Sequence, residues 1–211
     1  MISSKKKIVT FLLVLEEEIP QMTFSLKNLP GSSKIDVVAR NILATFPSYN
    51  NFDVNYIVLF TKNNPVTLTV RNLTEREKPY DEIEVASLIK ESLQIFLKQQ
   101  DETSNCVDPS LQFFSWQHLK DIKSLFSHIK NAFESVFYLH ENGQPFNVIK
   151  QDIQIVNSCC FIFGGRHDIS AEIEKIVDSI TTAQISLGKR SYLASTCITF
   201  VLYELEKIEK N

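Results

Sequence analysis

Short apolar runs alternate with amphipathic helical patterns along most of the chain, and this alternation constrains the fold more than any other feature. Strands that alternate with helices predict an α/β domain with a largely parallel sheet. The strand-like runs are residues 8–15, 54–60, 66–71, 111–114, 136–139, 155–163 and 183–187. The helical patterns are one that ends near residue 46, and residues 81–98, 117–133, 170–180 and 191–208.

The whole chain is expected to form one domain, residues 1–211. Its content of 44% hydrophobic and 22% charged residues is ordinary for a globular protein with a full core. The only candidate linker is the polar stretch of residues 99–109. A stretch of this length fits an intradomain loop as well as a domain boundary.

The N-terminal apolar run, residues 8–15, is expected to be the first strand. It is too short to span a bilayer. Three glutamates follow it, at residues 16–18, where a secretory signal would have a cleavage site with small residues. We therefore expect neither a membrane segment nor a signal peptide.

The four cysteines are Cys106, Cys159, Cys160 and Cys197. No pair has the spacing of zinc ligands, and the histidines form no pair four residues apart. The expected state is therefore four reduced thiols in a cytoplasmic protein that holds no metal.

The charge balance limits the kind of nucleic-acid contact that is possible. A formal net charge of −3 argues against a broad basic coat for non-specific binding. Local recognition stays open, because Lys34, Arg40, Lys189 and Arg190 could line one groove. The chain also lacks the phosphate-binding loop G-x-x-x-x-G-K-[ST], the dinucleotide motif G-x-G-x-x-G and the nucleophile elbow G-x-S-x-G.

Residues 161–197 are the strongest candidate for a ligand site. The chain has only five glycines, and Gly164, Gly165 and Gly188 lie in this stretch. They follow two apolar strand-like runs, and each run is followed by a helix-start signal. Backbone amides and helix N-termini gathered at strand ends form ligand sites in α/β proteins.

Two further segments carry polar residues that could act together. Asp36 and Arg40 are four apart in a helix that Ser32 or Ser33 could cap, and that spacing alone favours an ordinary ion pair. Residues 137–143, FYLHENG, read as a strand that ends in an Asn-Gly turn. Cys197 alone is more typical of a small buried core residue than of a reactive one.

Taken in order, five segments resemble the archaeal tRNA pseudouridine-54 N1-methyltransferase family, which belongs to the SPOUT class. It is related to the enzyme that N1-methylates a pseudouridine in small-subunit rRNA. The segments are FSLKNLPGSSKIDVVARN, YDEIEVASLIKESL, FYLHENG, FIFGG and ISLGKRSYLASTCITFVLYELE, and they extend from about residue 24 to residue 206. Five matching segments in one order are a more specific signal than any one of them.

The resemblance implies a SPOUT-type α/β fold whose C-terminal part, about residues 136–211, forms a trefoil knot and holds S-adenosylmethionine. It further implies a homodimer that acts on tRNA or another structured RNA containing pseudouridine. Part of the dimer contact would come from the last helix, through Leu193, Ile198, Val201, Leu202 and Leu205.

The family's functional residues carry over to matching positions of this chain. Asp36 matches the acidic residue beside the target nucleotide, and is expected to act as the base or to orient the substrate. Arg40 and Lys34 match RNA contacts, with Lys34 in place of the usual arginine. The expected cofactor contacts are Leu139, Gly164, Leu187, Gly188, Lys189, Arg190, Ser191, Tyr192 and Cys197.

Two positions depart from the family pattern. Thr196 stands where family members usually carry a histidine before the cysteine, and Gly165-Arg166 stands where an Asp-His pair usually follows the first strand-end glycine, with His167 displaced by one position. These changes leave two alternatives to a tRNA pseudouridine methyltransferase. One is a non-catalytic RNA-binding or assembly factor, and the other is an enzyme of the same fold with a different RNA target.

Overall fold

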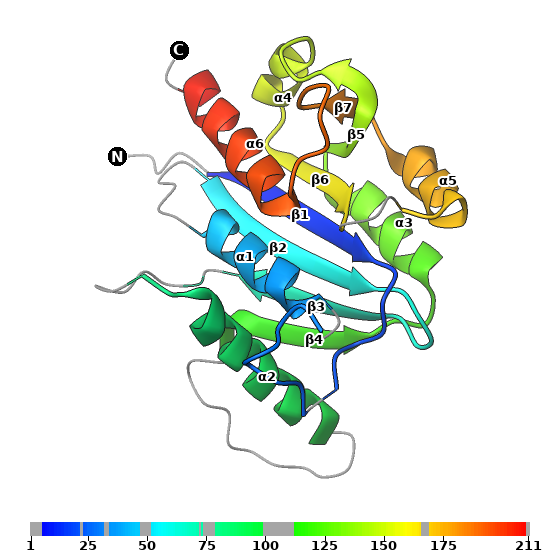
Figure 1. Ribbon diagram of the computed structural model, residues 1–211. Helices are drawn as coiled ribbons and strands as arrows, with labels where there is room; N and C mark the ends of the chain where they lie inside the picture. The colour runs from blue at the N-terminus through cyan, green and yellow to red at the C-terminus, as the bar shows by residue number, and fades with distance from the viewer. Residues whose placement is uncertain are drawn as a thin grey trace.

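The structure is a computed structural model, and it describes residues 6–21, 23–31, 34–46, 52–71, 73, 79–98, 112–165 and 169–209. Strands and helices alternate along the chain (Figure 1). The strands are β1 (Lys7–Leu15), β2 (Phe52–Phe60), β3 (Val66–Arg71), β4 (Phe114–His118), β5 (Ser135–Pro145), β6 (Ser158–Gly164) and β7 (Ala183–Ser186). The helices are α1 (Ile35–Thr45), α2 (Glu82–Lys98), α3 (Ile122–Ala132), α4 (Lys150–Ile155), α5 (Ala171–Ile180) and α6 (Ala194–Glu209).

The described strands form one seven-stranded sheet in the order β4-β3-β2-β1-β6-β5-β7. The neighbours from β2 to β7 pair in parallel, and only β3 and β4 run antiparallel to their neighbours. The expected α/β fold with a mostly parallel sheet is therefore confirmed. All parallel strands end at one edge of the sheet, which we call the carboxyl edge.

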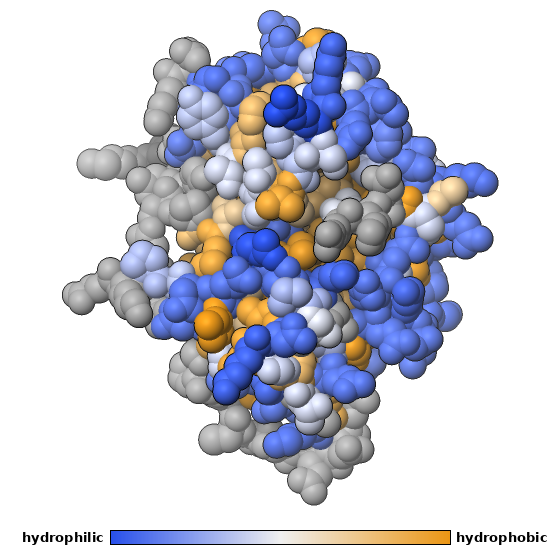
Figure 2. Space-filling model, viewed as in Figure 1, coloured by the Kyte–Doolittle hydropathy of each residue, from blue (hydrophilic) through white to orange (hydrophobic). Residues whose placement is uncertain are grey.

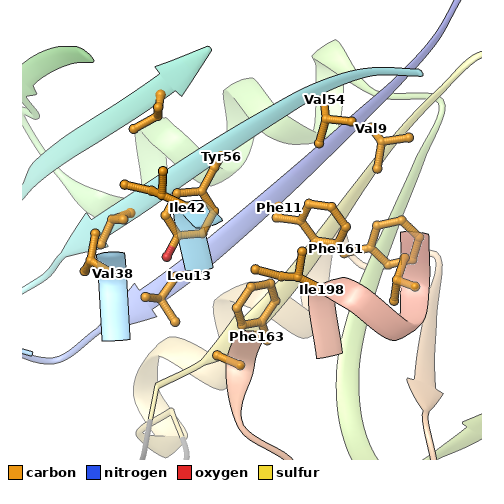
Figure 3. Packing of buried hydrophobic residues seen from close by; sticks show 14 of the residues in the cluster. Val9, Phe11, Leu13, Val38, Ile42, Val54, Tyr56, Phe161, Phe163 and Ile198 are labelled. Carbon is orange, nitrogen blue, oxygen red and sulfur yellow. The ribbon is translucent and has the colours of Figure 1, made fainter. Parts of the chain in front are cut away.

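Helices cover both faces of the sheet, and they create two hydrophobic cores. Side chains of α1, α2, α4 and α6 pack with one face, and those of α3 and α5 pack with the other (Figure 1). On the first face Phe11 of β1 stacks on Phe161 of β6, with ring centroids 5.6 Å apart, and Ile198 of α6 packs over them (Figure 3). The outer surface of the helices is largely hydrophilic, as expected for amphipathic helices (Figure 2).

The apolar run at the N-terminus forms the central strand β1. It pairs with β2 on one side and β6 on the other, and each residue from Val9 to Leu15 is buried. Such a strand needs mostly apolar side chains on both faces, which explains a run in which Thr10 is the one polar residue. In the described part of the chain, no helix combines the length and the apolar character needed to cross a membrane.

The expected helix over residues 117–133 is wrong at its start. Residues 114–118 form the edge strand β4, and α3 begins only at Ile122. The boundary is set by Asp121, whose carboxylate accepts a hydrogen bond from the Ser124 backbone N–H at 2.7 Å. This is the usual side-chain cap of a helix N-terminus, and it cannot form inside a continuous helix.

Other element boundaries also differ from the expected ones. Residues 150–155 form the short helix α4, so β6 begins at Ser158 and not at residue 155. The last helix starts at Ala194 and not at residue 191. The expected caps Ser32 and Ser33 lie outside the described residues, and Lys34, at φ 62°, holds the N-cap position of α1.

The apolar face of α6 points into the subunit's own core. Ile198, Val201, Leu202 and Leu205 are almost completely buried there. The expectation that these four residues form a dimer contact is therefore wrong. Leu193, just before α6, and Phe200 and Tyr203 on α6 are the large apolar residues that this segment leaves exposed.

Strand β5 does not end at the Asn-Gly pair, as its sequence suggests, but continues to Pro145 along β7. Ile185 of β7 is opposite both Leu139 and Gln144, so the residues between them bulge out of the ladder. The backbones come very close here, because a Cβ atom on Gly143 would lie 2.5 Å from the Ile185 backbone nitrogen. Glycine is needed at this position for a steric reason.

Replacing Gly143 with alanine is expected to lower the free energy of unfolding by about 2 kcal/mol, because the backbones must move apart to admit the methyl group. Urea denaturation would measure this change. Gly31→Ala is the matched control, since its Cβ would meet only the end of the flexible Asn28 side chain. Equal stability of the two variants would contradict the close approach.

Candidate functional site

A pocket of about 220 Å³ lies at the carboxyl edge, where β5, β6 and β7 end. Its walls come from three parts of the chain that are distant in sequence. They are the middle of β5 (Tyr138, Leu139, His140), the end of β6 (Phe163, Gly164, Gly165), and the β7–α6 loop with the start of α6 (Leu187, Gly188, Arg190, Ser191, Tyr192, Ala194, Cys197). The order of the strands in the sheet therefore brings the walls of this pocket together.

Most of the residues predicted as cofactor contacts line this pocket. They are Leu139, Gly164, Leu187, Gly188, Arg190, Ser191, Tyr192 and Cys197. Lys189 lines instead an adjoining cavity of about 510 Å³, between the end of β5 and α6. The two cavities share Glu141, Asn142, Leu187 and Gly188 as lining residues, so they lie next to each other beside the β7–α6 loop.

The β7–α6 loop is held in shape by its own hydrogen bonds. The Ser186 hydroxyl donates to the Gly188 carbonyl at 3.0 Å and accepts from the Gly188 N–H at 3.2 Å. Gly188 has φ 145°, a conformation that side chains with a Cβ rarely adopt. A Cβ there would also lie 3.0 Å from the Tyr192 hydroxyl, inside the pocket.

Cys197 contributes a thiol, and not a thiolate, to the pocket wall. Burial raises the pKa of the Cys197 thiol to about 11, so the group is protonated at neutral pH. A protonated thiol is a weak nucleophile, and this favours a packing role for Cys197. Cys159 and Cys160 are also free and are fully buried in β6, and Cys106 lies outside the described residues.

The part of the pocket wall that β5 forms carries a polar cluster that the sequence did not reveal. Glu174 of α5 accepts a hydrogen bond from the Tyr138 hydroxyl at 3.3 Å, and its Oε1 lies 3.8 Å from His140 Nε2. The Asn142 backbone N–H donates to His140 Nδ1 at 3.2 Å, which orients the imidazole ring. The FYLHENG segment was the available signal, but it suggested only a strand end.

Asp36 and Arg40 are brought together by the first turns of α1. Arg40 Nη2 donates to Asp36 Oδ2, and Arg40 Nε donates to the Asp36 carbonyl at 3.1 Å. Glu82 of α2 lies 3.6 Å from Arg40 Nε, so the guanidinium sits between two carboxylates. The ion pair that the spacing favours is confirmed.

The second oxygen of the Asp36 carboxylate is not bound by Arg40. Its Oδ1 is buried and has no hydrogen-bond partner in the described part of the chain. Most buried polar atoms in proteins are paired, so an unpaired carboxylate oxygen has a free energy cost and marks a position of functional interest.

The Asp36–Arg40 pair and the pocket lie near the same edge without sharing residues. Helix α1 packs beside α6, and both helices begin on the side of the sheet where the parallel strands end (Figure 1). Lys34, Asp36 and Arg40 line neither of the two cavities. A ligand in the pocket and a group at Asp36 would therefore be neighbours on one surface.

Of the residues that depart from the family pattern, Gly165 lines the pocket, and the others stand outside its wall or outside the described residues. Thr196 is exposed in the first turn of α6 and lines neither cavity. Arg166 and His167 are not among the described residues. Within the described ranges, no three His, Cys, Asp or Glu side chains are grouped so that they could hold a metal ion.

The comparisons with known proteins agree on one family. Residues 8–210 match the protein family described as "Putative SAM-dependent RNA methyltransferase". The chain is 26% identical over 202 residues to the tRNA (pseudouridine(54)-N(1))-methyltransferase of Methanocella arvoryzae, covering 93% of this chain and 98% of that protein. The proteins of the same name from Methanococcus maripaludis and Thermococcus kodakarensis are each 28% identical, over 94% and 91% of this chain and 98% and 96% of their own length.

The fold has a solved counterpart. The crystal structure of Archaeoglobus fulgidus Nep1 bound to S-adenosylhomocysteine superposes with a TM-score of 0.56 at 15% sequence identity. The match covers 98% of this chain and all of that one, so the two share a fold over their whole length.

The raised pKa predicts slow alkylation of Cys197. At pH 8 iodoacetamide should modify it at least about tenfold more slowly than a free cysteine, and the rate should rise as the pH approaches the pKa. Peptide mass spectrometry would follow Cys197 separately from the other cysteines. In the urea-unfolded chain it should react like a free cysteine, and equally fast reaction of the folded chain would contradict the prediction.

Proposed function

The chain belongs to the SAM-dependent RNA methyltransferase family, and from this premise we propose that it methylates N1 of a pseudouridine in tRNA. One observation carries the proposal: the pocket and a buried carboxylate with an unpaired oxygen lie near the same edge of the sheet. The printed activity of the similar archaeal proteins supports the choice of substrate. Another structured RNA that contains pseudouridine would suit the same chemistry.

The size and the lining of the pocket support it as the site of S-adenosylmethionine. Small-molecule sites measure roughly 300–1,000 Å³, and the 220 Å³ pocket together with the adjoining cavity falls in that range. Ile169, Ile185 and Leu187 offer an apolar slot for adenine, and the backbone at Gly164 and Gly188 offers N–H and C=O groups for its edge. Lys189 would contact the part of the cofactor that extends into the adjoining cavity.

The bound cofactor supplies an electrophilic methyl group. N1 of pseudouridine carries a proton at neutral pH, so the reaction also needs an acceptor for that proton. Asp36 Oδ1 is our candidate for it, because Arg40 occupies only Oδ2. Arg40 and Lys34 would bind the phosphate or base of the target nucleotide, and most of the acceleration would come from holding the reacting atoms in line.

The C-terminal part, about residues 136–211, would form the trefoil knot of the SPOUT class within a single domain. Two observations support this. β7 lies at the sheet edge beyond β5, yet α6 returns to pack beside α1, near the middle of the sheet. On the way the chain passes very close to the end of β5, where Phe146 N–H donates to the Ser186 carbonyl at 3.1 Å and Gly143 touches Ile185.

Two subunits would pair through the apolar residues that α6 and its neighbours leave exposed. These are Val148, Ile155, Tyr192, Leu193, Phe200 and Tyr203. Phe200 is part of the wall of the adjoining cavity, so a partner subunit at this surface would cover the cofactor's outer end. A cytoplasmic location fits the free thiols of Cys159, Cys160 and Cys197 and the proposed tRNA substrate.

Nucleoside mass spectrometry tests activity and target together. Total RNA fractions from cells with and without the protein would be digested, and N1-methylpseudouridine should be lost from tRNA in the deleted strain. Its loss from another RNA fraction would favour the same chemistry on a different target. If no methylated nucleoside were lost and the pure protein bound RNA without methylating it, a non-catalytic RNA-binding factor would replace our proposal.

Asp36→Ala is expected to lower the turnover number about 100-fold, because the N1 proton loses its acceptor. The affinity for S-adenosylmethionine should hardly change, since Asp36 lines neither cavity. Asp36→Asn keeps the shape of the side chain and should be about equally slow. A full methylation rate for either variant would remove Asp36 from the mechanism.

Gly188→Val is expected to weaken the binding of the cofactor, whereas Asp36→Ala is expected to slow turnover and leave binding unchanged. The strained backbone and the contact with Tyr192 should lower the affinity for S-adenosylmethionine more than tenfold. Isothermal titration calorimetry would measure the affinity, and a circular dichroism spectrum like that of the wild type would show that the fold is kept. Undiminished binding would place the cofactor elsewhere.

A further inference from the structure

The pairing of β5 with β7 is interrupted between Leu139 and Gln144. The four residues between them, 140–143, have no partner on β7 and form a bulge at the carboxyl edge. They have the sequence HENG, the last part of the FYLHENG segment. Bulges are common beside active sites, because they point side chains in directions that a regular strand does not allow.

Both ends of this bulge are held in place. At its first residue, His140 Nε2 lies 3.8 Å from Glu174 Oε1 of α5, and His140 Nδ1 accepts the Asn142 backbone N–H at 3.2 Å. At its last residue, Gly143 lies directly against the backbone of β7. Glu141 and Asn142 therefore sit between two fixed points of the backbone.

The side chains in the middle of the bulge face the place where the two cavities lie next to each other. Glu141 and Asn142 line both the pocket and the adjoining cavity, as do Leu187 and Gly188 of the β7–α6 loop. Both are exposed, and within the described ranges neither the Glu141 carboxylate nor the Asn142 side-chain amide forms a hydrogen bond or an ion pair. Their oxygens are thus available to accept hydrogen bonds from a ligand.

The junction of the cavities corresponds to the ribose of the cofactor. In the proposed binding mode, adenine occupies the apolar slot of the pocket and the amino-acid end extends toward Lys189 in the adjoining cavity. The ribose joins these two parts of S-adenosylmethionine, so it must lie where the two cavities meet. Its two neighbouring hydroxyl groups need hydrogen-bond acceptors when they leave water.

We propose that the Glu141 carboxylate accepts hydrogen bonds from the ribose hydroxyls of the cofactor, an inference that rests on the proposed function. A carboxylate offers two oxygens and accepts only, which suits a pair of hydroxyl donors. An acidic side chain binds a ribose hydroxyl in the same way in dinucleotide-binding α/β folds. Here the acidic residue is supplied by a strand bulge, and the Asn142 amide beside it would give a further acceptor.

The negative charge of Glu141 allows a different contact, with the positively charged sulfonium of S-adenosylmethionine. S-adenosylhomocysteine has the same ribose but no sulfonium charge. Its affinity therefore measures the contact with the ribose separately from the attraction between charges.

Isothermal titration calorimetry of the full chain with S-adenosylhomocysteine tests the proposal. Glu141→Ala should weaken binding about tenfold, because the ribose hydroxyls lose a charged acceptor. Glu141→Gln keeps one acceptor oxygen and should lose less. Glu172→Ala is the matched control, since Glu172 is an exposed acidic residue in the first turn of α5 that lines neither cavity. It changes the net charge equally and should bind as tightly as wild type.

Analogues of S-adenosylhomocysteine without one ribose hydroxyl provide an independent test. Wild type should bind the 2′-deoxy or the 3′-deoxy analogue about tenfold more weakly than the parent compound, and Glu141→Ala should lose nothing further with that analogue. Additive losses, or unchanged affinity of Glu141→Ala for S-adenosylhomocysteine, would overturn the proposal. A loss seen with S-adenosylmethionine alone would assign Glu141 to the sulfonium and would also overturn it. Urea denaturation would show that each variant keeps its fold.

The two proposals fail in different ways. Wild-type protein that shows the Glu141-dependent preference for the ribose but transfers no methyl group to RNA would keep the ribose contact and remove the enzymatic activity. Active wild-type protein together with a Glu141→Ala variant of unchanged affinity would keep the activity and remove the ribose contact. Wild-type protein that binds neither S-adenosylmethionine nor S-adenosylhomocysteine would remove both.

Discussion

The burial of β1 between two layers of helices is the constraint on which the rest of the structure depends. This strand pairs in parallel on both sides, and its residues from Val9 to Leu15 are closed off from water. Burying one large aliphatic side chain stabilises a fold by about 1.5–3 kcal/mol. Side chains on both faces of β1 can give this stabilisation only if helices cover both faces of the sheet. The three-layer arrangement follows from this requirement.

The parallel arrangement around β1 in turn creates the functional surface. Parallel strands end on the same side, so Leu139, Gly164 and Ile185 approach one another although they are far apart in the sequence. Segments of the chain approach one another closely around these strand ends. This is why the chain needs glycine at 143 and 188, where two backbones or a backbone and a tyrosine meet.

The Asp36–Arg40–Glu82 group contributes little to the stability of the fold. Arg40 is partly exposed, and an i, i+4 pair of this kind is worth only about 0.3–0.5 kcal/mol. Its effect is to orient the carboxylate of Asp36, leaving Oδ1 unpaired. The ion pair therefore orients the carboxylate more than it stabilises the fold.

The sequence by itself determined the alternation of strands and helices, the buried first strand and the ion pair of Asp36 with Arg40, while most of the pocket residues came from the resemblance to a known family. Periodicity and glycine placement are local properties, and they can be read along the chain. Only the tertiary structure decided that residues 114–118 form an edge strand, that Lys189 lines the adjoining cavity and that Ile198 faces the subunit's own core. Periodicity shows that a face is apolar but not what covers it, and the stacking of Phe96 on Trp116 joins a helix and a strand that only packing brings together.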